Sequence, residues 1–233
     1  MKSINLEDYN VPELICDIWD PLTPEQREFL AGQYTLQIYK KNEIIHFEGE
    51  TPTHMMCLLS GKVKIFKGGV GGRSQIIRMA GPVDYFGYRA YFAGQEYINA
   101  AAAFEPSVVC LLPLDAIDRL VRENSGLAMF FIHRLANNLG LSDMRTVNLT
   151  QKHIRGRLAE SLLFLKDSYG LEEDGSTISI FLSREDLANL SNMTTSNAIR
   201  TLSMFANERL ITIDGRKIKI IDEDKLKRIS KMG

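Results

Sequence analysis

A short segment near the C-terminus gathers side chains that can hydrogen-bond to base edges or phosphates. The residues are Thr195, Ser196, Asn197, Arg200 and Ser203, at positions that fall on one side of an α-helix. An arginine guanidinium can pair with both acceptors of guanine in the major groove, and small polar side chains allow a helix to approach closely. The alternative is an ordinary solvated helix face, which the same residues would also form.

Capping residues predict two short helices around this segment. Ser183 can cap a first helix, with Asp186 at its third position, and Thr194 can cap a second. Asn192 lies between them and tolerates the left-handed conformation of a tight turn. The expected buried face of the second helix consists of Ala198, Ile199, Leu202 and Phe205.

A basic hairpin is expected after these helices. The Asp-Gly pair at 214–215 separates the alternating runs 210–213 and 216–221, and such a pair is a strong hairpin signal. Helix, turn, helix and hairpin in this order are typical of a winged helix-turn-helix. Its wing would bring Arg216 and Lys217 close to a phosphate backbone.

The N-terminal half predicts antiparallel β structure. Short apolar or β-branched segments are separated by glycines, and the run 62–67 alternates polar and apolar side chains as a half-solvated strand does. Strands are expected at residues 43–47, 55–59, 62–66, 75–79 and 107–112. The glycine-rich segment 68–72 would form a hairpin tip. This pattern favours a β-roll or jelly roll.

Helical segments are expected between the β region and the hairpin. Residues 127–149 contain no proline and repeat apolar side chains at helical spacing, after a break at 123–126 that follows a helical stripe at 116–121. So long a helix could pair with its copy in a second subunit, or it could cover the β-roll as a core helix. Residues 153–169 predict a further helix, and residues 177–181 are strand-like.

Composition is that of a soluble globular protein. The chain is 45% hydrophobic and 24% charged, its apolar stretches are far shorter than the roughly 18 residues of a membrane span, and its N-terminus lacks a signal-peptide pattern. Cys16, Cys57 and Cys110 are widely spaced without a Cys-x-x-Cys pair, which favours a reducing cytoplasm and thiols that serve packing. Residues 1–150 carry a net charge of −3 and residues 151–233 of +2, which random variation explains as well as nucleic-acid binding does.

The order of these features resembles the CRP/FNR family, the cyclic-AMP-receptor and fumarate-nitrate-reductase regulators, over nearly the whole chain. Residues 182–188 look like the family's opening of the helix-turn-helix, and residues 156–163 look like the helix that enters the DNA domain. The resemblance implies a dimeric, cytoplasmic transcription regulator that binds near-palindromic double-stranded DNA and has RNA polymerase as a further partner.

The resemblance also implies the fold class, which is α+β. Residues 1–126 would form a cyclic-nucleotide-binding-like sensor domain with a double-stranded β-helix (jelly-roll) fold. Residues 127–150 would form a long dimerisation helix, and residues 151–233 a winged helix-turn-helix DNA-binding domain.

Individual DNA contacts follow from the same resemblance. Arg200 matches the arginine that such regulators direct at guanine. Ser196 replaces the glutamate that many members use, so the operator should differ from that of the cyclic-AMP receptor. The expected DNA-contacting residues are Ser183, Arg184, Thr194, Thr195, Ser196, Asn197, Arg200, Arg216 and Lys217.

The sensor half departs from the family's nucleotide-binding pattern. Tyr88 stands where nucleotide binders have the glutamate that receives the ribose, and Ile98 aligns with the arginine that holds the cyclic phosphate. A phosphate without that arginine loses a charge-assisted bond, so we expect no cyclic-AMP binding in the family's manner. The candidate effector-pocket residues are Gly87, Tyr88, Arg89, Ile98, Asn99 and Ser142. For Arg89 and Ser142 the sequence favours the simpler interpretation, a surface arginine and a helix-facing serine.

Other cofactors and activities have weaker support in the sequence. Cys16 alone cannot build the N-terminal cysteine set of an iron–sulfur regulator, whereas His46, His54, His133, His153 or a methionine could be an axial ligand in a haem or gas sensor. A cupin-like metalloenzyme would need clustered histidines with a carboxylate, and the sequence contains no His-x-His or nucleophile motif. We therefore expect no catalytic or metal site and no resident cofactor, with the effector unknown.

Overall fold

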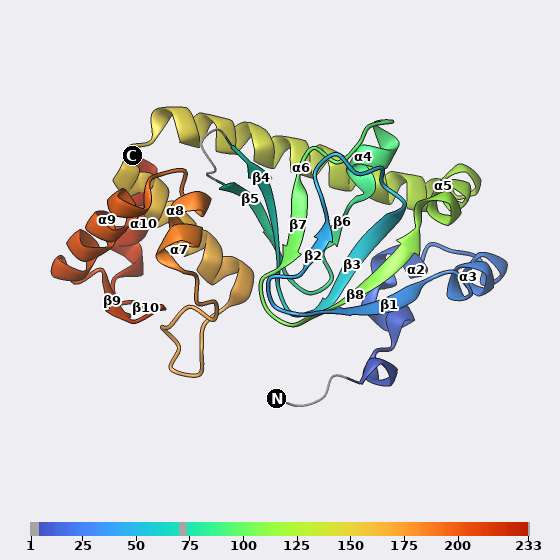
Figure 1. Cartoon of the computed structure of the whole chain (residues 1–233), viewed down its shortest axis with the longest axis horizontal. Helices are drawn as coiled ribbons and strands as arrows, with labels where there is room; N and C mark the ends of the chain where they lie inside the picture. Colours follow the sequence, from blue (N-terminus) through green and yellow to red (C-terminus); the bar gives the residue numbers. More distant parts are fainter. Residues whose placement is uncertain (1–4, 70–73, 233) are drawn as a thin grey trace. The chain divides into compact units, whose positions relative to one another are not determined.

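The chain forms two compact units in the computed structural model, which describes residues 5–69 and 74–232 (Figure 1). The first, called the β-roll unit below, contains residues 5–67 and 77–140. The second, the C-terminal unit, contains the described part of 68–76 and residues 141–232. Most of the predicted glycine-rich tip at 68–72 lies outside the described residues.

Two four-stranded sheets form the described part of the β-roll. Their strand orders are β1-β8-β3-β6 and β2-β7-β4-β5, so strands distant in sequence lie side by side. The strands are β1 (Thr35–Tyr39), β2 (Ile44–His46), β3 (His54–Ser60), β4 (Val63–Gly68), β5 (Ser74–Ala80), β6 (Tyr85–Phe86), β7 (Ala100–Ala103) and β8 (Ser107–Pro113). This double sheet is a jelly roll, which confirms the predicted fold class.

The five strands expected from the sequence are confirmed as β2, β3, β4, β5 and β8. The sequence did not indicate β7, which consists of four alanines that are all buried and pair antiparallel with β4. Alanine is depleted in strands because it has no branched side chain to pack on a pleated surface. Its small size suits the fully buried place that the neighbouring strands leave here.

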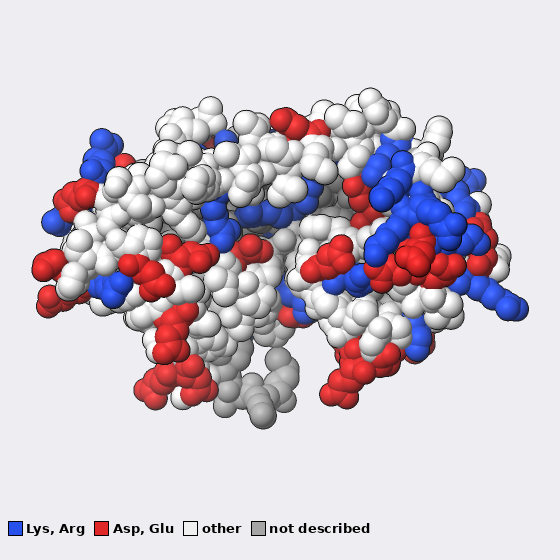
Figure 2. Space-filling model, turned by 180° about the vertical axis from the view of Figure 1, so that it is seen from behind, with Lys and Arg blue, Asp and Glu red and all other residues white. Residues whose placement is uncertain are grey.

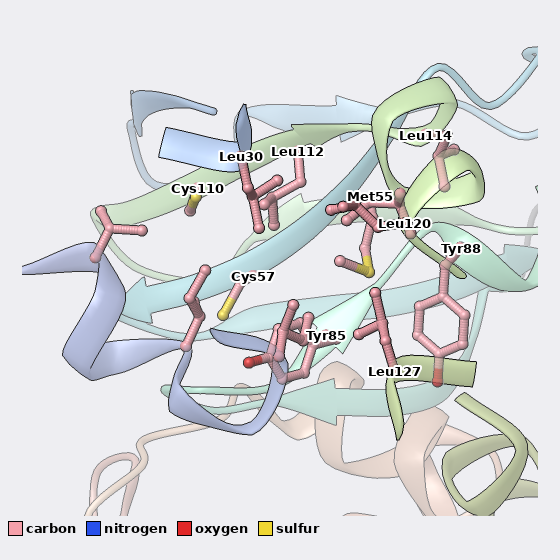
Figure 3. Packing of buried hydrophobic residues seen from close by; sticks show 14 of the residues in the cluster. Leu30, Met55, Cys57, Tyr85, Tyr88, Cys110, Leu112, Leu114, Leu120 and Leu127 are labelled. Atoms are coloured by element: carbon pink, nitrogen blue, oxygen red, sulfur yellow. The ribbon is translucent and has the colours of Figure 1, made fainter. Parts of the chain in front are cut away.

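The main core of the β-roll unit joins the first sheet to helices from both ends of the unit (Figure 3). Helices η1 (Leu6–Asp8), α1 (Val11–Leu14), α2 (Cys16–Trp19) and α3 (Pro24–Ala31) precede the first strand. These helices and the short links between them contribute the buried residues Val11, Ile15, Ile18, Leu22 and Leu30. These helices were not predicted from the sequence, although Thr23 and Gln26 form a capping box at the start of α3.

Two of the three thiols are packing residues of this core, as predicted. Cys57 on β3 and Cys110 on β8 are direct cross-strand partners, and both are free and fully buried. Burial raises the pKa of Cys110 to about 12 and raises that of Cys57 as well. Both side chains are therefore protonated thiols at neutral pH. Cys16 differs because it is exposed.

A second buried cluster fills the space between the two sheets. Tyr97 belongs to it and stacks on His46, with ring centroids 3.9 Å apart. Gly87 has a positive φ of 88°, and a Cβ atom there would meet the terminal carbon of the flexible Met56 side chain. The positive φ favours glycine at this position. The interior of the roll is thus occupied by the protein's own side chains at this point.

His46 is buried in the neutral state, and this predicts acid sensitivity. Desolvation lowers its pKa to about 4, and the backbone of Phe47 and the charge of Glu50 offset this only in part. In the unfolded chain the pKa is roughly 6.5, so between these values the unfolded state binds a proton that the folded state excludes. Stability of the β-roll should fall as the pH drops from 6.5 to 4, by on the order of 3 kcal/mol in total.

Urea unfolding between pH 7 and pH 4.5 measures this effect. His46→Phe keeps a ring against Tyr97 and should flatten the pH dependence, because the titrating group is gone. His133→Gln is the matched control, since His133 is exposed. An unchanged slope in His46→Phe would show that other groups govern the acid response.

Helix α5 (Leu114–Glu123) and helix α6 (Ser125–Gln151) confirm the two helical segments predicted after the strands. The predicted break at 123–126 is wrong in extent, because only Asn124 lies outside the helices. Its side-chain oxygen accepts a hydrogen bond from the backbone of Leu127, 3.0 Å away, and so allows α6 to start early. Leu127 and Phe131 of α6 are buried in the β-roll core.

The C-terminal unit contains helices α7 (Ile154–Tyr169), α8 (Arg184–Leu190), α9 (Thr195–Asn207) and α10 (Glu223–Met232) and the strands β9 (Ile211–Asp214) and β10 (Lys217–Ile220). Helix α7 confirms the segment predicted at 153–169. The predicted strand at 177–181 is wrong, because only single bridges form, one at Thr177 and one at Ile178. The carboxylate of Asp174 accepts hydrogen bonds from Thr177 and Ser176, which hold the chain in a turn there and lower the pKa of Asp174.

Candidate nucleic-acid interface

Helix α8 begins where the sequence predicted. Ser183 caps it by accepting a hydrogen bond from the backbone N–H of Asp186 at 3.0 Å, and its hydroxyl donates to the Asp186 carboxylate at 2.7 Å. The buried side of the helix carries Leu187 and Ala188. This local network fixes the start of α8 and the direction in which its first residues point.

A tight turn joins α8 to α9, and Asn192 has the predicted left-handed conformation with φ of 50°. Ser191, which ends α8, is buried and its hydroxyl lies 2.8 Å from that of Ser161 on α7. A buried hydroxyl pair satisfies both groups and ties the turn to the helix behind it. The turn between α8 and α9 is therefore anchored to α7.

Helix α9 starts at the predicted cap, because Thr194 accepts a hydrogen bond from the backbone of Asn197. Three of the four residues expected on its buried face are buried, namely Ala198, Leu202 and Phe205. The fourth, Ile199, was assigned wrongly: 49% of its surface is exposed, and Thr201 is buried instead. Ile199 lies at the edge of the apolar face that the sequence predicted for α9. In the folded unit this edge of the helix is in contact with solvent.

The opposite face of α9 presents polar groups to solvent. Thr195, Ser196, Arg200 and Ser203 are exposed, and Asn197 is half-buried. The side-chain oxygen of Asn197 accepts a hydrogen bond from Arg200 at 3.1 Å. This bond restrains a long side chain that would otherwise sample many rotamers, and it leaves the remaining donors of the guanidinium available.

The wing is a hairpin with a register one residue away from the expected one. Asp214 pairs with Lys217, so the loop residues are Gly215 and Arg216 rather than Asp214 and Gly215. Gly215 has φ of 55°, which a two-residue hairpin turn requires. Arg216 and Lys217 are exposed, as a phosphate contact requires, and the Lys217 ammonium lies 5.6 Å from the ring centre of Phe181.

Arg184 links the first helix to the wing. Its Nη2 atom donates to the Gly215 carbonyl at 2.7 Å, and its Nη1 atom is buried. The family resemblance placed Arg184 among the expected DNA contacts, and in the structure its guanidinium also connects α8 to the wing.

Arg184→Met should therefore loosen the wing even without DNA. A hydrogen bond from a charged donor contributes about 1.5–3 kcal/mol, so amide hydrogen exchange in residues 211–220 should accelerate by roughly tenfold or more. Arg216→Met, which changes an exposed arginine in the same loop, is the control and should leave exchange elsewhere in the hairpin nearly unchanged. Equal exchange in both variants would leave Arg184 without a role in holding the wing.

The predicted effector-pocket residues lie in different surroundings. Tyr88 is buried, and its hydroxyl accepts a hydrogen bond from Asn138 of α6 at 3.3 Å. It belongs to helix α4 (Tyr88–Phe92), which was not predicted from the sequence and for which Gly87 is the N-cap. Arg89 and Ile98 are exposed, and Asn99 is half-buried. Ser142 is exposed on α6 and belongs to the C-terminal unit.

Charge on the surface is mixed. Figure 2 shows Lys and Arg side chains interleaved with Asp and Glu on one face of the molecule. Among the described residues, no group of three or more His, Cys, Asp and Glu side chains could hold a metal ion. None of the described helices has the length and hydropathy of a membrane span.

Both halves of the chain match known domain families. Residues 36–124 match the cyclic nucleotide-binding domain, and residues 156–229 match the Crp-like helix-turn-helix domain. Two domains of these kinds in one chain define a class of DNA-binding regulators with a sensor domain. The chain belongs to the CRP/FNR family of transcription regulators.

Similar proteins cover nearly the whole length of the chain. The CRP-like cAMP-activated global transcriptional regulator of Mycobacterium tuberculosis is 24% identical over 212 residues, which span 91% of this chain and 95% of that protein. The transcriptional regulator LdrP of Thermus thermophilus is 28% identical over 195 residues, which span 82% and 94%. The structure of FixK2 from Bradyrhizobium japonicum has the same fold, with a TM-score of 0.76 at 23% identity over 84% of this chain and 96% of that one.

Proposed function

We propose that this transcription regulator binds a near-palindromic operator as a homodimer, with one α9 helix in each of two major grooves. The observation that carries this proposal is the exposed polar face of α9, on which Asn197 restrains Arg200. A restrained guanidinium on a closely approaching helix is suited to bidentate pairing with guanine. Arg216 and Lys217 of the wing would contact the phosphate backbone.

The exposed side of α6 supports a second copy of the chain as the partner. Met129, Ile132, Ala136, Leu139 and Val147 recur at spacings of three, four or eight, and all are exposed in the single chain. They lie opposite Leu127 and Phe131, which are buried in the β-roll core. In this proposal, one face of α6 covers the β-roll core and the opposite face pairs with a second copy of the chain. We call the exposed set of five the α6 seam.

The effector is proposed to be a molecule other than cyclic AMP. Tyr88 occupies the position of the ribose-binding glutamate and already contacts α6 through Asn138. Its ring also lies 5.3 Å from that of Phe131, centre to centre. Ile98 supplies no charge for a phosphate, and its carbonyl accepts a hydrogen bond from Lys67 instead. A cyclic nucleotide would therefore find neither of its charged partners at these positions.

The remaining parts of the proposal follow from the function of the family. A regulator of transcription acts with RNA polymerase, and the compartment that contains the DNA is the cytoplasm of a bacterial cell. The proposal includes no enzymatic activity and no resident cofactor. Native mass spectrometry of the protein from its own host would report the dimer together with any retained small molecule or haem.

Selection from a random duplex library tests the proposal directly. The full-length protein should enrich a near-palindromic sequence, and binding measured by fluorescence anisotropy should be at least about 1,000-fold tighter than for random DNA and fall steeply with salt. Absence of any preferred sequence would refute the function proposed. A tenfold or greater gain on adding cyclic AMP would refute the effector part alone.

A further inference from the structure

An exposed isoleucine lies within the polar face of the recognition helix α9. Ile199 is 49% exposed, whereas its neighbours Ala198 and Thr201 are almost completely buried. It lies one helical turn after Thr195 and one turn before Ser203, so these three residues form a single row on the helix surface. No other apolar side chain interrupts the exposed residues of α9 between Thr195 and Ser203.

The neighbouring polar groups leave Ile199 as the main contact of this row. The Ser203 hydroxyl donates to the backbone carbonyl of Ile199 at 3.0 Å, so its proton is directed back to the helix. Isoleucine is branched at Cβ and has one strongly preferred rotamer in a helix. Its side chain is therefore held in a fixed direction, and about half of its surface remains open for contact with another molecule.

Only one of the four bases presents an apolar group in the major groove, and that base is thymine with its 5-methyl group. We propose that Ile199 contacts a thymine methyl next to the base pair that Arg200 reads, and so specifies a thymine in each half-site. The inference rests on the proposed function, because it requires α9 to enter the groove. It adds an apolar determinant of specificity to the hydrogen bonds that the hydroxyls and Arg200 can form.

The position of Ile199 agrees with this role better than with a role in packing. Its side chain is adjacent in sequence to Arg200 and about 100° from it around the helix, so both can reach base edges in one groove. Met204, which is 40% exposed, lies farther along α9 and provides a comparison. A residue that only covers the core would be buried as Leu202 and Phe205 are.

Replacing thymine by uracil in the selected operator tests the proposal, because uracil lacks only the 5-methyl group. For the wild type, one uracil position per half-site should weaken binding by about fourfold, the factor that corresponds to burial of one methyl group. Both half-sites together should give about fifteenfold. Ile199→Ala should bind the thymine and uracil operators within about twofold of each other.

Two matched variants separate this contact from general damage to the helix. Met204→Ala should keep the wild-type discrimination between thymine and uracil. Arg200→Ala should lose guanine preference while it keeps the response to uracil. If the wild type enriches an operator but no uracil position weakens binding, or if Ile199→Ala keeps the full response, the assignment of Ile199 is wrong. If no sequence is enriched at all, the proposed function fails and the assignment fails with it.

Discussion

Replacing Arg200 with alanine is expected to weaken operator binding by about 1–3 kcal/mol and to remove the preference for guanine at one position of each half-site. The physical reason is the loss of two parallel hydrogen bonds to one base. The side-chain oxygen of Asn197 accepts a hydrogen bond from the guanidinium at 3.1 Å in the free protein, which reduces the rotamer freedom that is lost when DNA binds. Competition binding against operators with each base at that position measures the change.

Lys217→Ala is the matched control for Arg200→Ala. Lys217 is exposed on the wing and would contact a phosphate, which carries no sequence information. The variant should bind every sequence more weakly by a similar factor. The slope of log affinity against log salt concentration should fall by about 1 for each phosphate contact that is lost. If Arg200→Ala also lost affinity equally on all sequences, Arg200 would be a phosphate contact and not a reader of bases.

The helix-turn-helix could be predicted from the sequence because the interactions that define it are short-range along the chain. Its helix starts depend on Ser183 and Thr194, and its turn depends on Asn192, and each acts on residues no more than three positions away. Local capping and left-handed turns are decided by single side chains. The same holds for most strands of the roll, because alternation within a strand is a local signal.

Features that depend on packing were not accessible in this way. The elements that pack against α9 decide its rotation about its own axis, which exposes Ile199 and buries Thr201. A stripe of four apolar residues in the sequence does not define this rotation closely enough to distinguish the two positions. The register of the wing also differs by one residue from the predicted one, since Asp214 pairs with Lys217. The alanines of β7 carry no strand signal of their own and follow their partners.

The sensor half shows how a family pattern can be lost while the fold is kept. Tyr88 brings an aromatic ring and a hydroxyl to the place of a carboxylate, and the hydroxyl bonds to Asn138 on the helix that carries the α6 seam. The protein's own side chain thus makes a contact between the roll and α6. Beside Gly87 the interior of the roll contains the ends of the Met56 and Tyr97 side chains.

The second large expected effect is that of a charged substitution in the α6 seam on dimerisation and operator affinity. Leu139→Glu places a carboxylate in the middle of the proposed interface, where a second copy would bring an identical charge close to it. An unpaired charge in an apolar interface costs several kcal/mol, and two like charges repel in addition. We expect a monomer at micromolar concentration, measured by sedimentation equilibrium. Operator affinity should fall by roughly 100-fold or more, because one recognition helix then binds without the other.

Asn137→Glu is the matched control for Leu139→Glu, because Asn137 is exposed on the same helix but outside the α6 seam. This variant adds the same charge and should remain a dimer with nearly unchanged operator affinity. Circular dichroism should show that both variants are folded, since Leu139 is 64% exposed and its replacement removes little from the core of the single chain. A dimeric Leu139→Glu with wild-type affinity would place the subunit contact elsewhere, since two glutamates cannot be accommodated in a seam that excludes water.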